Sequence, residues 1–278
     1  MPSFTDLAFT HSLAASIDGT VRFECSSDIA QWPWLALHPF DPIVVQSINF
    51  WASVETAMFR GTYDPAKWSA LTHCSWHCGD PGVSRAVRGV SETSGAQETP
   101  GYTLTLYDQN DALVFTISGR GVVFQNRDFE TWRANAKQAL GVPAASDLFP
   151  YAPLHAVDAS GLGQCFLTVP SGNSAPTAQG LITKENGFPP AHPFLSGSGD
   201  HVNTTHIAEV GRQFARLLYD NNRLTFDQGA MELKRFVELN IPFRLTLRAS
   251  AQQGQHLTID LHQAERLCAT MTLRVQPN

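Results

Sequence analysis

The sequence predicts an α+β protein made of two similar halves, each with an antiparallel sheet curled over one long buried helix. Each half has the same order of elements: a strand, a histidine-containing loop, a long helix and then several strands. The helix of the first half is apolar almost all round, which is typical of a helix enclosed by protein. The repeat period is about half of the chain, which is too long for a solenoid.

Composition places the chain among globular proteins. Of its 278 residues, 43% are hydrophobic and 16% are charged, which argues against disorder. The net charge of −6 and the lack of a lysine or arginine cluster argue against nucleic-acid binding. No apolar run reaches membrane-spanning length, and the start lacks the basic region of a signal peptide. The five cysteines are irregularly spaced, so we expect no disulfide framework and a reducing, cytoplasmic location.

In the first half, residues 19–26 have the pattern of a strand. Asp41 is a good N-cap and Pro42 suits a first helical turn, so a helix is predicted to begin there. It should run to about Arg60 and end at Gly61. Alternating or β-rich segments then predict strands over 69–77, 84–93, 102–108 and 112–124.

Two glycines and a short helix complete the first half. Gly119 and Gly121 lie within a predicted strand and indicate a bulge or a close backbone approach. Asp128 is predicted to cap a short amphipathic helix that ends at Gly141. The proline- and alanine-rich stretch that follows is interpreted as a linker. The predicted domains are therefore residues 1–140 and 155–278, joined by a linker over 141–154.

The second half repeats this order of elements. A helix is predicted from about Asn203 to Asp220, with Asp200 as the simplest N-cap. Pro242 and Gly254 mark turns between later strands. The predicted strands are 164–169, 179–184, 232–238, 243–250, 255–261 and 266–275.

Short motifs in both halves resemble the hot-dog superfamily, in which a curved antiparallel sheet wraps one long helix. His38-Pro-Phe-Asp41-Pro42-Ile-Val resembles the histidine loop of 3-hydroxyacyl-ACP dehydratases, and Glu209-Val-Gly-Arg-Gln213 is similar to the acid-x-x-x-Gln of their central helix. The second half also resembles the A-factor biosynthesis hot-dog family. That likeness rests on residues 192–194, 200–202, 209–213 and 235–242. The resemblance implies a tandem double hot dog.

The chain departs from both families at one place. Their acid-bearing stretch usually follows a Pro-Gly pair, and here those positions read Val45-Gln46 and Asn203-Thr204. The pair helps to shape the helix entry and the oxyanion donor, so its absence bears on catalysis.

In the resembled dehydratases the histidine and the acid come from opposite hot dogs. The resemblance therefore implies that His38 pairs with Glu209, while His192 faces Trp51 at a second site that lacks an acid. A histidine and a carboxylate in an apolar slot can supply the base and the acid that dehydration needs. We expect the substrate to contact Asp41, Trp51, His201, Asn203 and Gln213.

Structural alternatives exist for several of these residues. Glu209 could form an ion pair with Arg212, and Gln213 could hydrogen-bond within the fold. His201 and His206 flank the helix start and are alternatives to His192. Glu55 could replace the missing acid, or be a solvated or paired helix residue.

The function predicted on this basis is dehydration of a β-hydroxyacyl thioester on acyl carrier protein, in a specialised polyketide or fatty-acid pathway. The alternatives are an A-factor-type acyltransferase, a thioesterase and a non-catalytic acyl-binding partner protein. The expected partners are an acyl carrier protein or a CoA thioester, with a homodimer of double hot dogs also open. Candidates for a carrier-docking patch are Arg85, Arg88, Arg120, Arg127 and Arg133.

No cofactor and no metal are expected. His73, Cys74, His77 and Cys78 have residue types that bind zinc. They lie in a predicted strand, however, where neighbouring side chains alternate between faces, and no second ligand cluster occurs in the sequence.

Overall fold

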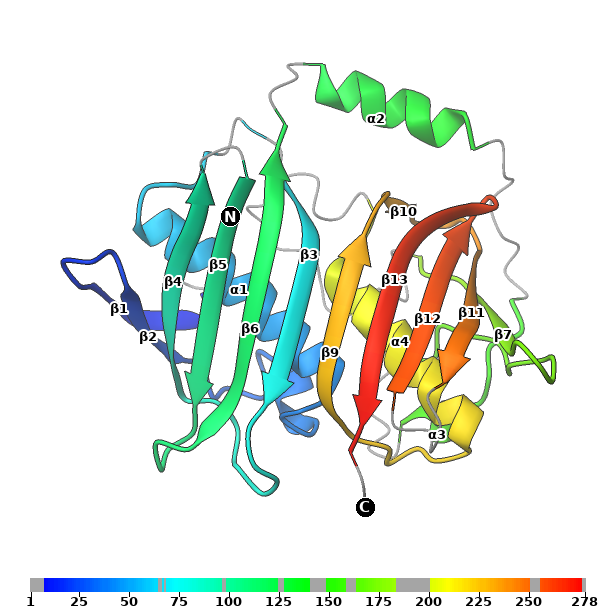
Figure 1. Cartoon of the computed structure of the whole chain (residues 1–278), viewed down its shortest axis with the longest axis horizontal. Coiled ribbons are helices and arrows are strands. Elements are labelled where there is room, and N and C mark those ends of the chain that lie inside the picture. Colours follow the sequence, from blue (N-terminus) through cyan, green and yellow to red (C-terminus); the bar gives the residue numbers. More distant parts are fainter. Residues whose placement is uncertain are drawn as a thin grey trace. The chain divides into compact units, whose positions relative to one another are not determined.

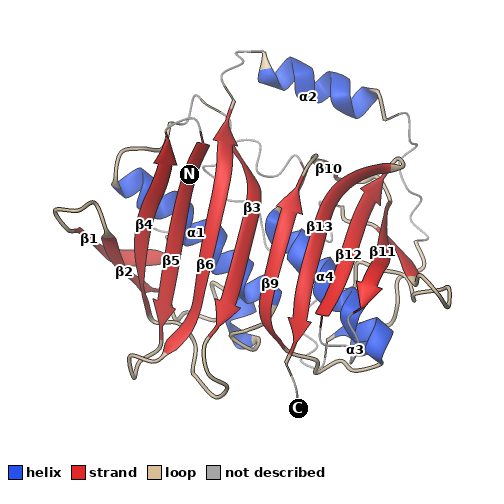
Figure 2. Cartoon of the chain, in the orientation of Figure 1, coloured by secondary structure: helices blue, strands red, loops and turns tan. Residues whose placement is uncertain are grey.

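A computed structural model describes residues 8–64, 67, 69–96, 99–124, 128–140, 149–158, 164–183, 201–250 and 256–276. The chain divides into two compact units, Met1–Phe124 and Gln125–Asn278 (Figure 1). In each unit one long helix lies against one face of an antiparallel sheet (Figure 2). The predicted α+β architecture is therefore confirmed in both halves.

The first unit contains a sheet with the strand order β1-β2-β4-β5-β6-β3, in which all neighbours are antiparallel. Its central helix, α1, contacts β1, β4, β5 and β6. A short 3-10 helix, η2, precedes α1. The bounds are β1 Thr10–Ala15, β2 Val21–Cys25, η2 Pro33–Ala36, α1 Pro42–Phe59, β3 Ser69–Cys78, β4 Arg88–Ala96, β5 Thr99–Tyr107 and β6 Leu113–Val123.

Helix α1 begins and ends where the sequence predicts. Asp41 is the N-cap, Pro42 is the first helical residue and Arg60 is the C-cap. The side chain of Asp41 makes no capping hydrogen bond, but its carbonyl oxygen accepts hydrogen bonds from the N–H groups of Val44 and Val45 at 2.8 and 3.1 Å. Most of the helix is buried, which fits its nearly uniform apolar surface.

Glu55 is the acidic residue of α1, and it is only 3% exposed. Its carboxylate accepts hydrogen bonds from the N–H groups of Phe9 and Thr10 at 2.8 and 2.7 Å, and from the Thr10 hydroxyl at 2.6 Å. Burial raises the pKa of Glu55, and these hydrogen bonds act in the opposite direction. Glu55 thus ties β1 to α1. The sequence did not predict β1, because the segment lacks a strand pattern of its own.

The two glycines of β6 make the close approaches that the sequence predicts. A Cβ atom on Gly119 would overlap the ring of Tyr102, and one on Gly121 would lie 2.6 Å from the carbonyl oxygen of Ala70. The β3–β6 register also shifts between Leu71 and His73. The predicted close approach is confirmed.

The second unit contains a sheet with the order β9-β13-β12-β11-β7 and a separate two-stranded pair, β10-β8. Helix α4 is its central helix and contacts β13 and α3. The bounds are α2 Phe129–Gln138, α3 Leu154–Val157, β7 Thr177–Gly180, β8 His201–Val202, α4 Thr204–Tyr219, β9 Phe226–Leu233, β10 Val237–Glu238, β11 Phe243–Ser250, β12 His256–Gln263 and β13 Arg266–Val275.

The second half follows its predicted elements less closely than the first. The last three predicted strands are confirmed as β11, β12 and β13. The prediction of one strand over 232–238 is wrong, because β9 ends at Leu233 and the chain turns before β10. The strand predicted over 164–169 is also wrong: Leu167 there forms an isolated bridge with Gly180. The strand predicted over 179–184 lies earlier, as β7.

The start of α4 also differs from its prediction. Asn203 is the N-cap, and its side-chain oxygen accepts a hydrogen bond from the N–H of His206. Asp200, the predicted cap, lies outside the described residues. At the middle of α4, a Cβ atom on Gly211 would overlap the end of the Met271 side chain, so the glycine allows β13 to pack closely.

The boundary between the units lies before α2, not after it. We expected this helix in a first domain ending at residue 140, but it groups with the second unit, which starts at Gln125. The reason is a buried ion pair between Arg133 of α2 and Glu238 of β10. Sequence proximity alone gave no sign of this contact, because the two residues are 105 positions apart.

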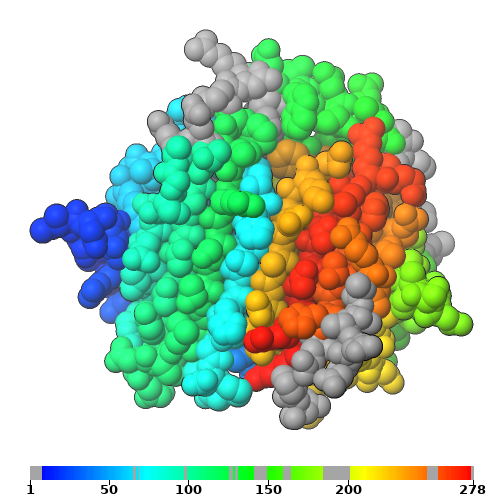
Figure 3. Space-filling model, in the orientation of Figure 1, coloured from blue at the N-terminus to red at the C-terminus, as the bar shows by residue number. Residues whose placement is uncertain are grey.

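The face of each sheet turned away from its helix reaches the molecular surface. In Figure 3 the atoms of β5 and β6 in the first unit and of β13 in the second lie at the surface. The alternating burial of these strands agrees with one buried and one solvent-facing side. Within the described parts of the chain, no helix has the length and apolarity needed to cross a membrane.

Replacing Glu55 with glutamine should lower the free energy of unfolding by about 1–3 kcal/mol, because at least one buried N–H of Phe9 or Thr10 then loses its acceptor. Urea denaturation of the two proteins would measure this. The matched control is Glu92→Gln, since Glu92 is exposed on β4 of the same unit. Equal stability of Glu55→Gln and the unchanged protein would contradict an anchoring role for Glu55.

Candidate active site

The start of α4 in the second unit gathers the polar groups best suited to bind a reacting molecule. The side-chain oxygen of Asn203 accepts hydrogen bonds from both the backbone N–H and the Nδ1 of His206, at 3.1 and 2.8 Å. The first-turn N–H groups of a helix have no acceptor within the helix, and the helix dipole makes this end positive. Such an end can stabilise a developing negative charge.

His206 is the central side chain of this arrangement and is 6% exposed. Burial, with a smaller contribution from His201, lowers the pKa of His206 to about 4. The imidazole is therefore neutral at physiological pH. With Nδ1–H donated to Asn203, Nε2 keeps its lone pair, and it has no hydrogen-bond partner among the described residues. The hydroxyl of Thr205, 0% exposed, is likewise without a partner in the described part of the chain.

His201 lies two residues before the N-cap, in β8, and is half-buried. Its ring packs edge-on against Phe236, with the ring centres 4.8 Å apart. In the β8–β10 ladder it lies directly opposite Glu238. His201 and Asn203, both expected to contact substrate, therefore lie together with His206 at one end of α4.

Glu209, the predicted acid, is one turn further along α4 and 2% exposed. Both of its carboxylate oxygens accept hydrogen bonds from Arg212, each at 2.7 Å, and Oε1 also accepts one from Gln213 at 2.8 Å. This is the ion pair that the sequence offered as the structural alternative. Neither oxygen lacks a donor, so Glu209 as it stands is placed for packing the helix rather than for exchanging a proton.

Gln213 also has a role within the fold. Its Nε2 donates to the carbonyl of Gln164 at 2.6 Å, and its Oε1 accepts from the N–H of Phe166 at 2.9 Å. These bonds fasten the segment before β7 to α4. The structure therefore matches the alternative in which Gln213 hydrogen-bonds inside the protein.

The other predicted residues belong to the first unit or lie outside the described residues. His38 is exposed, and its Nδ1 accepts a hydrogen bond from the N–H of Phe40 at 3.2 Å. Asp41 is buried at the start of α1. Trp51 is 3% exposed and packs against Trp32, with ring centres 4.7 Å apart. His192 is among the residues that are not described. The pairings of His38 with Glu209 and of His192 with Trp51 stay predictions.

The first unit has no histidine at the corresponding position of its helix. Val44 is the third residue of α1, where His206 is the third residue of α4. Further along α1, Gln46 and Asn49 form a buried polar group that receives a hydrogen bond from Tyr102 at 2.8 Å. Because only α4 has a histidine in its first turn, the second unit is the better candidate for catalysis.

The zinc-type residues of β3 divide between the two faces of the strand. Cys74 and Cys78 are buried, whereas His77 is exposed and His73 is intermediate. Across the described residues, no group of three or more histidine, cysteine, aspartate or glutamate side chains could hold a metal ion.

The arginines proposed for carrier docking have different surroundings. Arg133 is 4% exposed and paired with Glu238, so it is wrong as a docking residue. Arg88 is bound by Asp111 and by the carbonyl of Asp108. Arg85 and Arg120 are exposed, and Arg127 is outside the described residues.

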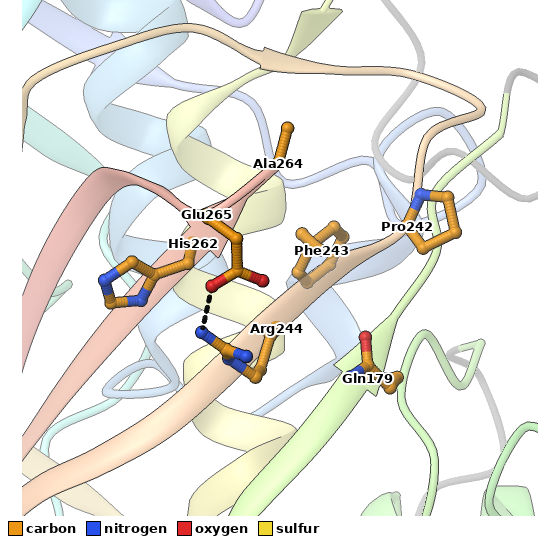
Figure 4. A pocket seen from close by; sticks show the side chains of 7 residues that line it. All are labelled: Gln179, Pro242, Phe243, Arg244, His262, Ala264 and Glu265. Atoms are coloured by element: carbon orange, nitrogen blue, oxygen red, sulfur yellow. Dashed lines mark hydrogen bonds and ion pairs between the residues drawn. The ribbon is translucent and has the colours of Figure 1, made fainter. Parts of the chain in front are cut away.

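A small pocket lies beside the start of β11, the end of β12 and the turn between β12 and β13, away from the residues of the α4 site (Figure 4). It is lined by Gln179, Phe243 and His262, among others, and by an Arg244–Glu265 ion pair at 3.0 Å. Its volume of about 80 Å³ is well below the roughly 300 Å³ at which small-molecule sites begin. It is too small for an acyl thioester.

A curved antiparallel sheet that wraps a single buried helix defines a hot-dog domain, and the chain carries two of them. Solved structures agree with this class. An acyl-ACP thioesterase from Bacteroides thetaiotaomicron superposes with a TM-score of 0.58 at 9% identity, covering 93% of this chain and 97% of that one. A 12:0-ACP thioesterase from Umbellularia californica gives 0.53 at 10% identity, with the same coverage.

A third similar structure is a conserved hot-dog protein of unknown function from Alicyclobacillus acidocaldarius, with a TM-score of 0.51 at 11% identity over 100% of both chains. No protein-family model and no curated protein sequence matches the chain. At these identities the likeness establishes the hot-dog fold. The expected hot-dog fold is confirmed, while the narrower resemblance to dehydratases and to the A-factor family is not supported by these structures.

His206 and Thr205 were not among the residues predicted to act on the substrate, although His206 was an alternative to His192. A usable signal was present in the sequence. A histidine three residues after an Asn N-cap can have its ring fixed by the cap side chain. That signal was hidden because the cap was assigned to Asp200.

Replacing Arg212 with methionine should lower the free energy of unfolding by about 3–5 kcal/mol, because it leaves the Glu209 carboxylate buried without its main partner. Chemical denaturation would measure the loss, with Arg223→Met as the control at an exposed position. A loss below about 1 kcal/mol, the range of exposed ion pairs, would show that the pair is not structural.

The protonation of His206 should make stability depend on pH. The folded pKa is about 4 and the ordinary value is 6.5, so only the unfolded chain binds this proton between the two values. The free energy of unfolding should therefore fall, by up to about 3 kcal/mol from this group, as the pH drops from 6.5 to 4. His206→Gln should flatten that part of the curve, whereas His256→Gln, at an exposed site, should not.

Proposed function

We propose that this protein hydrolyses acyl thioesters, with the start of α4 as the place where water attacks the thioester carbonyl. The observation that carries the proposal is the neutral, buried imidazole of His206. Asn203 fixes its Nδ1, and its Nε2 has no partner in the described structure. Similar solved structures include acyl-ACP and acyl-CoA thioesterases, which supports the same chemistry.

In the proposed reaction, Nε2 of His206 accepts a hydrogen bond from the attacking water. This hydrogen bond orients a lone pair of the water oxygen toward the carbonyl carbon. The carbonyl oxygen becomes an oxyanion, which first-turn N–H groups of α4 stabilise. The carbon–sulfur bond then breaks. The thiolate leaves with a proton from the water, and the products are a carboxylic acid and a thiol. His201, at the edge of the site, contacts the substrate.

The chemistry of the leaving group favours hydrolysis over dehydration here. A thiol has a pKa of about 8.5, so it leaves as a thiolate with little help from an acid. Dehydration instead expels hydroxide, a much poorer leaving group, because its conjugate acid, water, has a pKa of about 15.7. Dehydration therefore needs a strong proton donor. Glu209 was the predicted donor, but both of its oxygens accept hydrogen bonds from Arg212.

The thioester substrate is carried by CoA or by an acyl carrier protein, and both present the same phosphopantetheine arm. The similar structures include an acyl-ACP thioesterase and an acyl-CoA thioesterase. The net charge of −6 does not favour an acidic carrier protein. Docking of one would therefore depend on exposed basic residues such as Arg85 and Arg120.

His206→Ala should lower kcat/KM for acyl-CoA and acyl-ACP hydrolysis at least about 100-fold, as expected for loss of a group that acts on the attacking water. Thiol release with a chromogenic reagent would measure the rate, and mass spectrometry would identify the products. His256→Ala is the control. Undiminished thiol release by His206→Ala would refute the proposed site.

The same assay separates the other activities considered. Loss of one water from a 3-hydroxyacyl substrate, without thiol release, would indicate the dehydratase, and His38→Ala and Glu209→Gln would then be decisive. Transfer of the acyl group to an added hydroxyl compound would indicate an acyltransferase. Binding without turnover would indicate an acyl-binding protein.

A further inference from the structure

Among the described residues, a buried ion pair attaches helix α2 to the second unit. Among the α2 residues whose side chains are described, Arg133 is the buried one, at 4% exposure. Its Nη1 and Nη2 donate to the two carboxylate oxygens of Glu238 at 2.5 and 2.8 Å, and Lys137 approaches the same carboxylate at 3.9 Å. An isolated helix of ten residues is unstable in water, so the order of α2 depends on this attachment.

The other partner, Glu238, lies in a strand that is itself firmly held. The side chain of Gln263, at the end of β12, accepts a hydrogen bond from the N–H of Glu238 at 2.7 Å. It also donates to the carbonyl of Glu238 at 3.0 Å. β10 pairs with β8 so that Glu238 lies opposite His201. The carboxylate that binds α2 therefore belongs to the residue paired with His201 in the β8–β10 ladder.

Phe236 provides a second connection between α2 and the site. The guanidinium carbon of Arg133 lies 4.2 Å from the centre of the Phe236 ring, within the range of a cation–π interaction. The ring centres of His201 and Phe236 are 4.8 Å apart, and those of Trp132 and Phe236 are 6.4 Å apart. One aromatic side chain thus contacts both the arginine of α2 and the histidine that precedes α4.

We propose that Arg133 and Glu238 are positioning residues for the α4 site. The ion pair holds α2 against β10, and β10 together with Phe236 fixes the position of His201. The structural coupling from Arg133 to His201 stands independently, whereas its effect on catalysis rests on the proposed thioester hydrolysis.

The location of the pair favours this role over simple stabilisation. Burying an arginine and a carboxylate costs solvation, and apolar residues of similar size often stabilise a fold equally well. Here the charged pair is placed on the strand opposite His201, and its guanidinium is shared with the ring that His201 contacts. Loss of the pair should therefore be felt at His201.

The test compares Arg133→Met with Arg248→Met in the full chain. Arg248 makes a bidentate pair of similar geometry with Asp260, at 2.7 and 2.7 Å, but at an exposed position on β11 and β12 of the same unit. In Arg133→Met, the amides of α2 should exchange with solvent at least about tenfold faster. The His201 Hε1 resonance should also shift, because the Phe236 ring moves. Neither change is expected in Arg248→Met.

For hydrolysis of an acyl-CoA, Arg133→Met should lower kcat about tenfold with KM nearly unchanged, the pattern of a disturbed transition-state geometry. The double variant Arg133→Met/Glu238→Leu removes both charges and leaves no buried carboxylate unpaired. It should recover the stability lost in the single variant but leave the His201 resonance shifted, because an apolar contact does not fix Phe236 as the guanidinium does.

Release of α2 without any change in the His201 resonance would overturn the proposal, as would an equal loss of kcat in Arg248→Met. An unchanged kcat in Arg133→Met despite a displaced His201 would also overturn it. If the unchanged protein hydrolyses no thioester, the proposed function fails, while the exchange and resonance measurements still decide the coupling.

Discussion

The structure depends on the enclosure of each central helix by its own sheet and loops. A polar group on such a helix is removed from water, and it must find a partner inside the protein or be costly. Glu55 on α1 finds backbone N–H groups of β1, and Glu209 on α4 finds Arg212 and Gln213. The Glu55 bonds place β1, and Gln213, which also donates to Glu209, places the segment before β7. The charged-type residues of the helices thus order elements that have weak patterns of their own.

The same enclosure explains why the start of α4 is the best candidate for chemistry. His206 has one nitrogen satisfied by Asn203 and one without a partner in the described structure. Burial keeps this ring neutral by lowering its pKa to about 4. Glu209, in contrast, has its hydrogen bonds complete. A side chain that has a nitrogen without a hydrogen-bond partner, at the positive end of a helix, can bind a substrate. A side chain whose hydrogen bonds are all made within the protein mainly stabilises the fold.

The second unit has a set of contacts that links a peripheral helix to the start of its central helix. Arg133 and Glu238 join α2 to β10, and β10 pairs with the strand that leads into α4. Because a buried ion pair is strongly direction-dependent, it defines a position more narrowly than an apolar contact of equal area. The arrangement joins α2 to the residues before α4 through a few specific contacts.

The sequence by itself determined the two-fold repeat, the α+β class and both bounds of α1, since these depend on local signals: apolar periodicity, Asp41, Pro42 and Gly61. It also predicted the close approach at Gly119 and Gly121. Only the tertiary structure decided that α2 belongs to the second unit, that Asn203 rather than Asp200 caps α4, and that Glu209 is paired. The first depends on a partner distant in sequence and the second on competition between nearby caps. The third was one of two local alternatives for Glu209, and only burial in the folded protein decides between them.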